Sequence, residues 1–205
     1  MKQEVNPQET SRAEAFSLWM SSPQPMVTLI KTLDVTRLVK VSKKTGIKFT
    51  SLMCWCIGKA ANGIEEFFFL PENGRLYRYD KLAINIVVQN VKGGICLCDV
   101  PYSDDIQQFN ADYLELTGQA VTTCKSSALE DHMIVGTSAL TQTELDGIIN
   151  QYSGRYNNLF IAWARYRKGF FKTTLPVSMQ FHHAQMDGGH ATRFLQCLQD
   201  EINKM

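Results

Sequence analysis

Hydrophobic and polar residues recur along the chain with two periods, one typical of helices and one typical of strands. Apolar residues stand at helical spacing in the segment that ends near Asn203 and again over residues 104–120, at Ile106, Phe109, Tyr113 and Leu116. Residues 175–181 (LPVSMQF) instead show the alternation of a strand that has one apolar face. The chain therefore combines amphipathic helices with half-buried strands.

These patterns, together with capping residues and Gly or Pro breaks, predict five helices and eight strands. The predicted helices cover residues 9–20, 34–44, 50–62, 104–120 and 191–203. The predicted strands cover residues 26–33, 67–70, 75–80, 83–89, 94–100, 133–140, 159–167 and 175–181. Helices and strands are interleaved and several strands follow one another as hairpins, which favours an α/β or α+β fold with a mixed sheet.

Composition and charge exclude several classes of protein. Hydrophobic residues make up 44% of the 205 residues and charged residues 20%, as in globular domains, and the length suits one domain or a tight pair. Lys and Arg (21) balance Asp and Glu (20), so no basic field exists to bind a nucleic acid. No apolar run is long enough to span a membrane, and the polar first residues predict no secretory signal.

The six cysteines predict neither a metal site nor a disulfide scaffold. Two pairs lie in CWC (residues 54–56) and CLC (residues 96–98), whereas zinc sites usually leave two to four residues between ligands. We expect small buried side chains in a reducing cytoplasm.

Three of the four histidines fall in one short segment, HHAQMDGGH, at residues 182–190. A predicted strand ends there and a helix begins, and Asp187 can cap that helix. On local grounds three interpretations stay open: a turn with surface histidines, a metal site, or a general base. Adjacent histidines on a strand point to opposite faces, which weakens the metal interpretation.

The HHAQMDGGH segment resembles the active-site signature of chloramphenicol acetyltransferases, in which two histidines precede an Asp-Gly pair and a terminal helix. Dihydrolipoyl acyltransferase catalytic domains carry a related form. Further segments resemble the family in the same order along the chain, namely Arg12–Phe16, Pro101–Leu114, Thr137–Leu140 and Leu175–Gln180. The resemblance covers nearly the whole chain.

This resemblance implies an α/β fold for residues 1–205, a single acetyltransferase domain in which helices cover a large mixed sheet as a two-layer sandwich. It implies a homotrimer whose active sites lie at subunit interfaces, where one chain's catalytic histidine faces its neighbour's substrate pocket. The implied reaction moves the acetyl group of acetyl-CoA, a co-substrate, to a hydroxyl of chloramphenicol or a similar xenobiotic. It implies no metal.

The family's site residues correspond to named positions here. The second histidine, His183, would be the general base, and Ser138 would donate a hydrogen bond to the oxyanion. Asp187 would pair with Arg12 and hold the histidine loop in shape as a buried pair, while His182 would be structural. Lys48, Arg165 and Tyr166 would lie near the coenzyme, and Trp19 near the acceptor.

The chain departs from the family's pattern in the acceptor pocket. Seven residues at five sites differ: Leu18–Trp19 replaces a Phe-Tyr pair, Gly136 an asparagine, Thr141–Gln142 a Pro-Trp pair, Ile148 a phenylalanine and Ala162 a threonine. Three functions therefore compete: acetylation of chloramphenicol, acylation of a different small alcohol or amine, and ligand binding without turnover. A dihydrolipoyl acyltransferase core is disfavoured because the chain begins almost at the catalytic fold. We expect a cytoplasmic protein.

Overall fold

Ten strands form two separate sheets in the computed structural model, which describes residues 1–205. The strands are β1 (Gln3–Val5), β2 (Met26–Asp34), β3 (Phe69–Glu72), β4 (Arg75–Arg78), β5 (Leu82–Gln89), β6 (Ile95–Pro101), β7 (Met133–Leu140), β8 (Phe160–Ala164), β9 (Arg167–Lys168) and β10 (Thr173–His182). The larger sheet has the order β2-β10-β8-β7-β5-β6, with β9 paired to β10. Strand β7 runs parallel to β5 and β8, and the other pairs are antiparallel, so the sheet is mixed.

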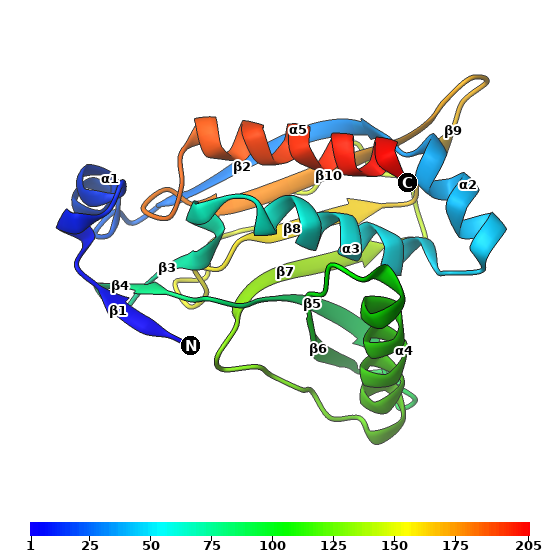
Figure 1. Ribbon diagram of the computed structural model, residues 1–205, viewed down its shortest axis with the longest axis horizontal. Coiled ribbons are helices and arrows are strands. Elements are labelled where there is room, and N and C mark those ends of the chain that lie inside the picture. The colour runs from blue at the N-terminus through cyan, green and yellow to red at the C-terminus, as the bar shows by residue number, and fades with distance from the viewer.

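Helices α2 (Thr36–Thr45), α3 (Phe49–Asn62), α4 (Ile106–Thr123) and α5 (Gly188–Lys204) lie on one side of this sheet (Figure 1). Helix α1 (Ala13–Trp19) lies beyond one end of the sheet, and two short 3₁₀ helices span Pro7–Glu9 and Glu65–Phe68. Helices α3 and α5 lie side by side, and α4 packs on β5 and β6. The predicted α/β class with a large mixed sheet under helices is confirmed.

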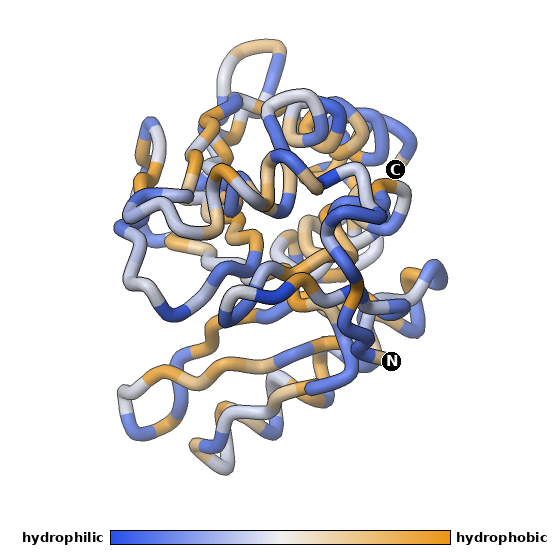
Figure 2. Tube along the Cα trace, turned by 90° about the vertical axis from the view of Figure 1, so that its left-hand side faces the viewer, coloured by the Kyte–Doolittle hydropathy of each residue, from blue (hydrophilic) through white to orange (hydrophobic).

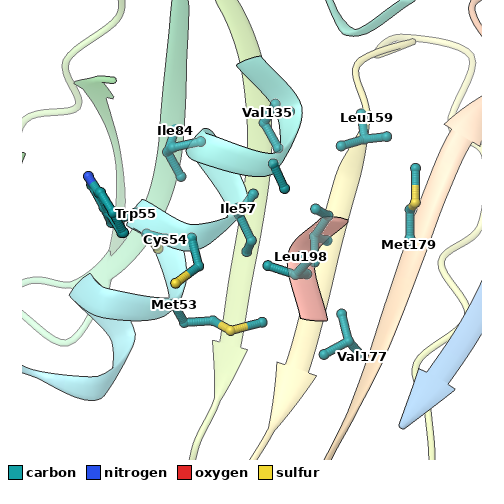
Figure 3. Close-up of a cluster of buried hydrophobic side chains, with 14 of the residues drawn as sticks. Met53, Cys54, Trp55, Ile57, Ile84, Val135, Leu159, Val177, Met179 and Leu198 are labelled. Carbon is teal, nitrogen blue, oxygen red and sulfur yellow. The ribbon is translucent and has the colours of Figure 1, made fainter. Parts of the chain in front are cut away.

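The hydrophobic core lies between the helices and the sheet because alternate strand residues point to the same face. Val135 on β7 and Val177 on β10 are fully buried there, and Figure 3 shows them beside Cys54 and Ile57 of α3. Leu198 of α5 enters the same cluster. Helix α3 is buried almost all round, as its nearly uniform apolar sequence predicts.

The opposite face of the sheet is rich in polar residues. One row of aligned positions crosses five strands there, running Asp99–Asn85–Gly136–Phe160–Gln180. Burial of polar groups on a sheet is costly unless they are hydrogen-bonded, so such a row is expected only where it meets a partner or a ligand. One face of the sheet therefore forms the hydrophobic core with the helices, and the other face presents polar groups.

Two segments differ from the sequence-based prediction. The expected strand over 159–167 is broken between β8 and β9, where the backbone N–H of Arg165 bonds Thr143 outside the ladder. Strand β1 was not predicted, because its three residues (two polar and exposed, one apolar and partly buried) are too few to show a periodicity. It pairs with β4, so the predicted hairpin of β3 and β4 becomes a separate three-stranded sheet.

All six cysteines are free. Cys54, Cys56, Cys96 and Cys98 are buried, as predicted, whereas Cys124 and Cys197 are only partly buried. Burial raises the pKa of the Cys54 thiol to about 12, despite its contact with Thr137, so this thiol is unreactive at neutral pH. Hydrophobic and hydrophilic positions are mixed along the whole chain (Figure 2). None of the helices is both long and apolar enough to cross a bilayer.

The close contact between α3 and Tyr102 gives a prediction about packing. A Cβ at Gly58 would lie 2.5 Å from Cδ2 of the Tyr102 ring, so Gly58→Ala should lower the free energy of unfolding by about 1–3 kcal/mol. Gly118 in α4 is the matched control, since nothing lies within 4 Å of its added Cβ. Gly118→Ala should raise stability by about 1 kcal/mol through helix propensity. Urea unfolding of both variants tests this, and equal effects would contradict it.

Candidate active site

The predicted histidine segment forms the connection from β10 to α5. Asp187 is the N-cap of α5, where its Oδ1 accepts from the N–H groups of Gly189 and His190 at 2.9 and 3.3 Å. His190 completes a capping box, because its Nδ1 accepts from the Asp187 N–H. Its Nε2 then donates to Glu66 at 3.1 Å. The start of α5 is therefore fixed both by its own capping bonds and by the contact of His190 with Glu66.

Arg12 fastens this connection to the N-terminal part of the chain. Its side chain is 3% exposed and donates to the carbonyl oxygens of His183 (3.0 Å) and Ala184 (3.3 Å). A third bond goes to Oδ2 of Asp187, at 3.3 Å. One guanidinium thus fixes the backbone next to the candidate base as well as the helix cap.

The Asp187 carboxylate is only partly buried, which corrects the expectation of a buried pair. Its side chain is 45% exposed. Burial alone would raise its pKa, but the hydrogen bond from the His190 N–H, the nearby His190 ring and the Arg12 guanidinium together hold the pKa below its usual value. The pair with Arg12 therefore contributes less to stability than a fully desolvated pair does.

The imidazole of His183 is held in a definite orientation. Its ring stacks on Trp19, with centroids 4.4 Å apart and planes within 3°, and the Phe181 ring approaches it from another side. The backbone N–H of His183 donates to Pro25 at 2.8 Å. Nδ1 is buried and has no partner, whereas the residue as a whole is half-exposed, so Nε2 is the nitrogen that can reach another molecule.

His182 differs from His183 in its burial and in its hydrogen bonding. It is 1% exposed, lies on the polar face of the sheet, and its Nδ1 accepts from the Ala184 N–H at 3.1 Å. Burial, with a smaller effect from the charge of His183, lowers its pKa to about 4. A neutral, buried ring with a backbone bond supports the loop and is not available for proton transfer at neutral pH.

Ser138 lies far from His183 within one chain. Register aligns Ser138 with Ala162 and then with Ser178, two strands away and five residues before His183. With strand spacings of ~4.8 Å and a rise of ~3.3 Å per residue, the two Cα atoms are roughly 19 Å apart. His183 also follows Phe181 in pointing to the helix-covered side, whereas Ser138 is on the polar side. The structure does not bring these two residues together in one copy.

The three predicted coenzyme residues lie near the C-terminal end of the central strand β8, which Arg165 and Tyr166 directly follow. The Tyr166 ring contacts Phe49, the neighbour of Lys48, at a centroid distance of 5.1 Å. Lys48 is exposed just before α3, and exposed Arg165 donates to the Gln142 carbonyl. Two exposed cations beside an aromatic ring could meet phosphate groups. No group of three or more His, Cys, Asp or Glu side chains is arranged to hold a metal ion.

A pocket of about 650 Å³ lies on the polar face of the sheet, next to Ser138 in register. Its walls include Gly136, which the resemblance places in the acceptor pocket, and Asn85, Asp99 and Gln180, which the sequence analysis did not single out. A signal was present, since Asn85 and Asp99 interrupt two otherwise apolar strands. None of the predicted catalytic or coenzyme residues lines this pocket.

Comparisons with known proteins decide the family. The profile described as chloramphenicol acetyltransferase matches residues 3–199. The chain belongs to the chloramphenicol acetyltransferase family. It is 28% identical to chloramphenicol acetyltransferase 2 of Escherichia coli over 196 residues, covering 92% of this chain and 91% of the relative. It is also 28% identical to chloramphenicol acetyltransferase 3 of the same organism over 201 residues, covering 94% and 92%.

Solved structures show the same fold. A chloramphenicol acetyltransferase superposes with a TM-score of 0.85 at 18% identity, covering 98% of this chain and all of the other. Dihydrolipoamide acetyltransferase of Azotobacter vinelandii superposes with a TM-score of 0.65 at 17% identity, covering 93% and 84%. The predicted link to both kinds of acyltransferase is confirmed at the level of fold.

One departure from the chloramphenicol acetyltransferase pattern has a steric cause in this structure. A Cβ at Gly136 would lie 2.7 Å from the Phe160 ring, so the space that the family's asparagine would need is filled by an aromatic side chain. Phe160 aligns with Gly136 on the next strand and lines the same pocket. In this chain Gly136 and Phe160 together form this part of the pocket wall.

The lowered pKa of His182 predicts a pH dependence of stability. The unfolded chain protonates this histidine below about pH 6.5 and the folded chain only below about pH 4, so acid favours unfolding between these values. His182 should cost the folded state up to about 3 kcal/mol across this range. In His182→Asn, whose Oδ1 can still accept from Ala184, this part of the pH dependence should vanish.

Urea unfolding at several pH values between 4 and 6.5 measures this effect. The stability advantage of the original chain over His182→Asn should shrink steadily as the pH falls. A difference that stays constant over this range would show that His182 titrates in the same way in both states.

Proposed function

We propose that this protein transfers the acetyl group of acetyl-CoA to a hydroxyl of a small acceptor, chloramphenicol or a similar xenobiotic, with His183 as the general base. The orientation of His183 carries the proposal. Arg12 fixes its carbonyl, Trp19 stacks on its ring, and burial of Nδ1 leaves Nε2 facing outward. A base held within reach of a hydroxyl accelerates such a transfer by about a hundred- to ten-thousandfold.

The proposed reaction needs no reactant other than the acceptor alcohol and acetyl-CoA. Nε2 of His183 accepts the proton of the acceptor hydroxyl while the hydroxyl oxygen attacks the carbonyl carbon of the thioester. The oxyanion that forms accepts a hydrogen bond from the Ser138 hydroxyl. The carbon–sulfur bond then breaks, and Nε2 donates its proton to the thiolate of coenzyme A. The acetyl ester and free coenzyme A are the products.

A separation of roughly 19 Å between His183 and Ser138 supports a site shared by two copies of the chain. The pocket opens on the polar face beside Ser138, and His183 points to the other side of its own sheet. We propose that a second copy presents its His183 to this pocket, in a homotrimer. Lys48, Arg165 and Tyr166 would bind the coenzyme, and Trp19 would position both the base and the acceptor.

The altered pocket favours a second candidate, an acyltransferase for a different alcohol or amine. Phe160 over Gly136, and Ala162 in place of the family's threonine, change the walls near Ser138. Such changes alter which acceptors can complete their hydrogen bonds. If the acceptor is chloramphenicol, we further propose that the protein acts in the cytoplasm and contributes to antibiotic resistance.

Release of free thiol from acetyl-CoA tests the reaction. Release that requires an added acceptor, chloramphenicol or a member of an alcohol and amine panel, is expected. His183→Ala should reduce it about a hundredfold or more and leave unfolding unchanged. Asp187→Ala should reduce activity and also lower stability by roughly 2 kcal/mol, since it removes a helix cap and a charged bond. Equal losses of stability in both variants would contradict these roles.

Mixed oligomers test the shared site. His183→Ala and Ser138→Ala should each be nearly inactive alone. When the two variants are unfolded and refolded together, some interfaces join an intact His183 to an intact Ser138, so activity should rise well above the sum of the separate variants. A monomer in solution, or no recovery in mixtures that do form oligomers, would overturn the shared site.

A further inference from the structure

The pocket beside Ser138 contains one charged residue. Its remaining walls combine apolar side chains with neutral polar ones, and none of them is Lys, Arg or His. The charged residue is Asp99, which is 5% exposed and lies in the polar row described above, aligned with Asn85. A buried carboxylate with no cation beside it is costly, so its environment needs explaining.

The partners of Asp99 within the chain are neutral and few. Oδ1 accepts from Asn85 Nδ2 at 2.6 Å, and Oδ2 accepts from the Leu129 N–H at 2.9 Å. A carboxylate can accept about four hydrogen bonds, so roughly half of its capacity is unused. These two bonds fix the carboxylate in place but supply no positive charge.

The neighbouring polar groups in the row present acceptors as well. Asn85 must turn its Nδ2 toward the carboxylate, so its Oδ1 is left without a partner in the chain. Gln180 directs its Nε2 to the Asn150 carbonyl (2.7 Å) and to Thr28 (3.3 Å), so its Oε1 is likewise left over. One carboxylate and two amide oxygens thus line the same row, and a ligand that fits them must supply hydrogen-bond donors.

We infer that the acceptor substrate is a cationic amino alcohol, whose ammonium group binds Asp99 while its hydroxyl lies beside Ser138. The inference rests on the proposed acetyl transfer and, within it, favours the second candidate, a different alcohol, over chloramphenicol, which has no ammonium group. Asp99 and Ser138 are two strands and two residues apart, roughly 12 Å between Cα atoms, so the ammonium and the hydroxyl must be separated by several bonds. An ammonium beside Asp99 can also donate to Oδ1 of Asn85 on the next strand, whereas Gln180 lies four strands and roughly 19 Å from Asp99, so its Oε1 would meet another part of the ligand.

Matched pairs of acceptors test the charge. Aminopentanol is compared with hexanol, and aminocyclohexanol with methylcyclohexanol, so that an ammonium is exchanged for a methyl group of similar size. Thiol release should give a kcat/KM about ten- to a hundredfold higher for the ammonium member, as expected for a charge-assisted hydrogen bond. Affinity without acetyl-CoA is measured in parallel by an NMR titration.

Two variants separate the charge from the fold. In Asp99→Asn the new amide can accept from Leu129 and donate to Asn85 after that side chain turns over, so the fold should be kept and the preference lost. In the exchange of Asn85→Asp with Asp99→Asn, both internal bonds are preserved and a carboxylate returns to the pocket, so the preference should return. Asp200→Asn, on the exposed side of α5, is the control and should change nothing.

Each outcome bears on one of the two proposals. Aminopentanol that binds through Asp99 without any thiol release would overturn the acetyl transfer and leave the cationic ligand in place. Turnover with equal efficiency for both members of each pair would support the transfer and overturn the cationic acceptor. A preference for the ammonium compound that survives Asp99→Asn would also overturn the cationic acceptor. A lack of both turnover and binding would overturn it as well.

Discussion

The histidine loop depends on one buried guanidinium. Arg12 lies just before α1, far from residues 183–187 in sequence, yet it bonds two carbonyl oxygens and the helix-capping carboxylate of that loop. Carbonyl oxygens at a strand end would otherwise be buried without partners, which costs more than the bonds themselves contribute. A planar group with several fixed donors meets all three acceptors at once, whereas a lysine would not.

The same N-terminal segment also orients the His183 ring. Helix α1 ends at Trp19, and its indole stacks on the His183 ring about two turns away from the Arg12 clamp. The clamp fixes the backbone of His183 and the indole fixes its side chain. A short, exposed helix with no buried residue of its own is thereby held against the loop that it organises.

The two faces of the large sheet divide the remaining work. One face packs under α3 and α5 and supplies the apolar core, while the other carries a row of polar residues and the pocket. His182 and His183 are neighbours in sequence but belong to opposite sides, so one is a neutral structural group and the other is directed outward. This alternation also separates His183 from Ser138, and that separation is the geometric ground for the proposal of a site built from two copies.

The sequence by itself determined the helices and strands with strong periodicity, the burial of α3, the cap at Asp187 and the family, because these depend on local spacing or on short contiguous motifs. It could not determine that β1 joins β3 and β4, because a three-residue strand is too short to show a pattern. Nor could it reveal the stacking of Trp19 on His183, the Phe160 ring over Gly136, or the meeting of Asn85 with Asp99. Each of these is a contact between distant segments, and only the register of the strands and the packing of the loops decided which side chains share a space.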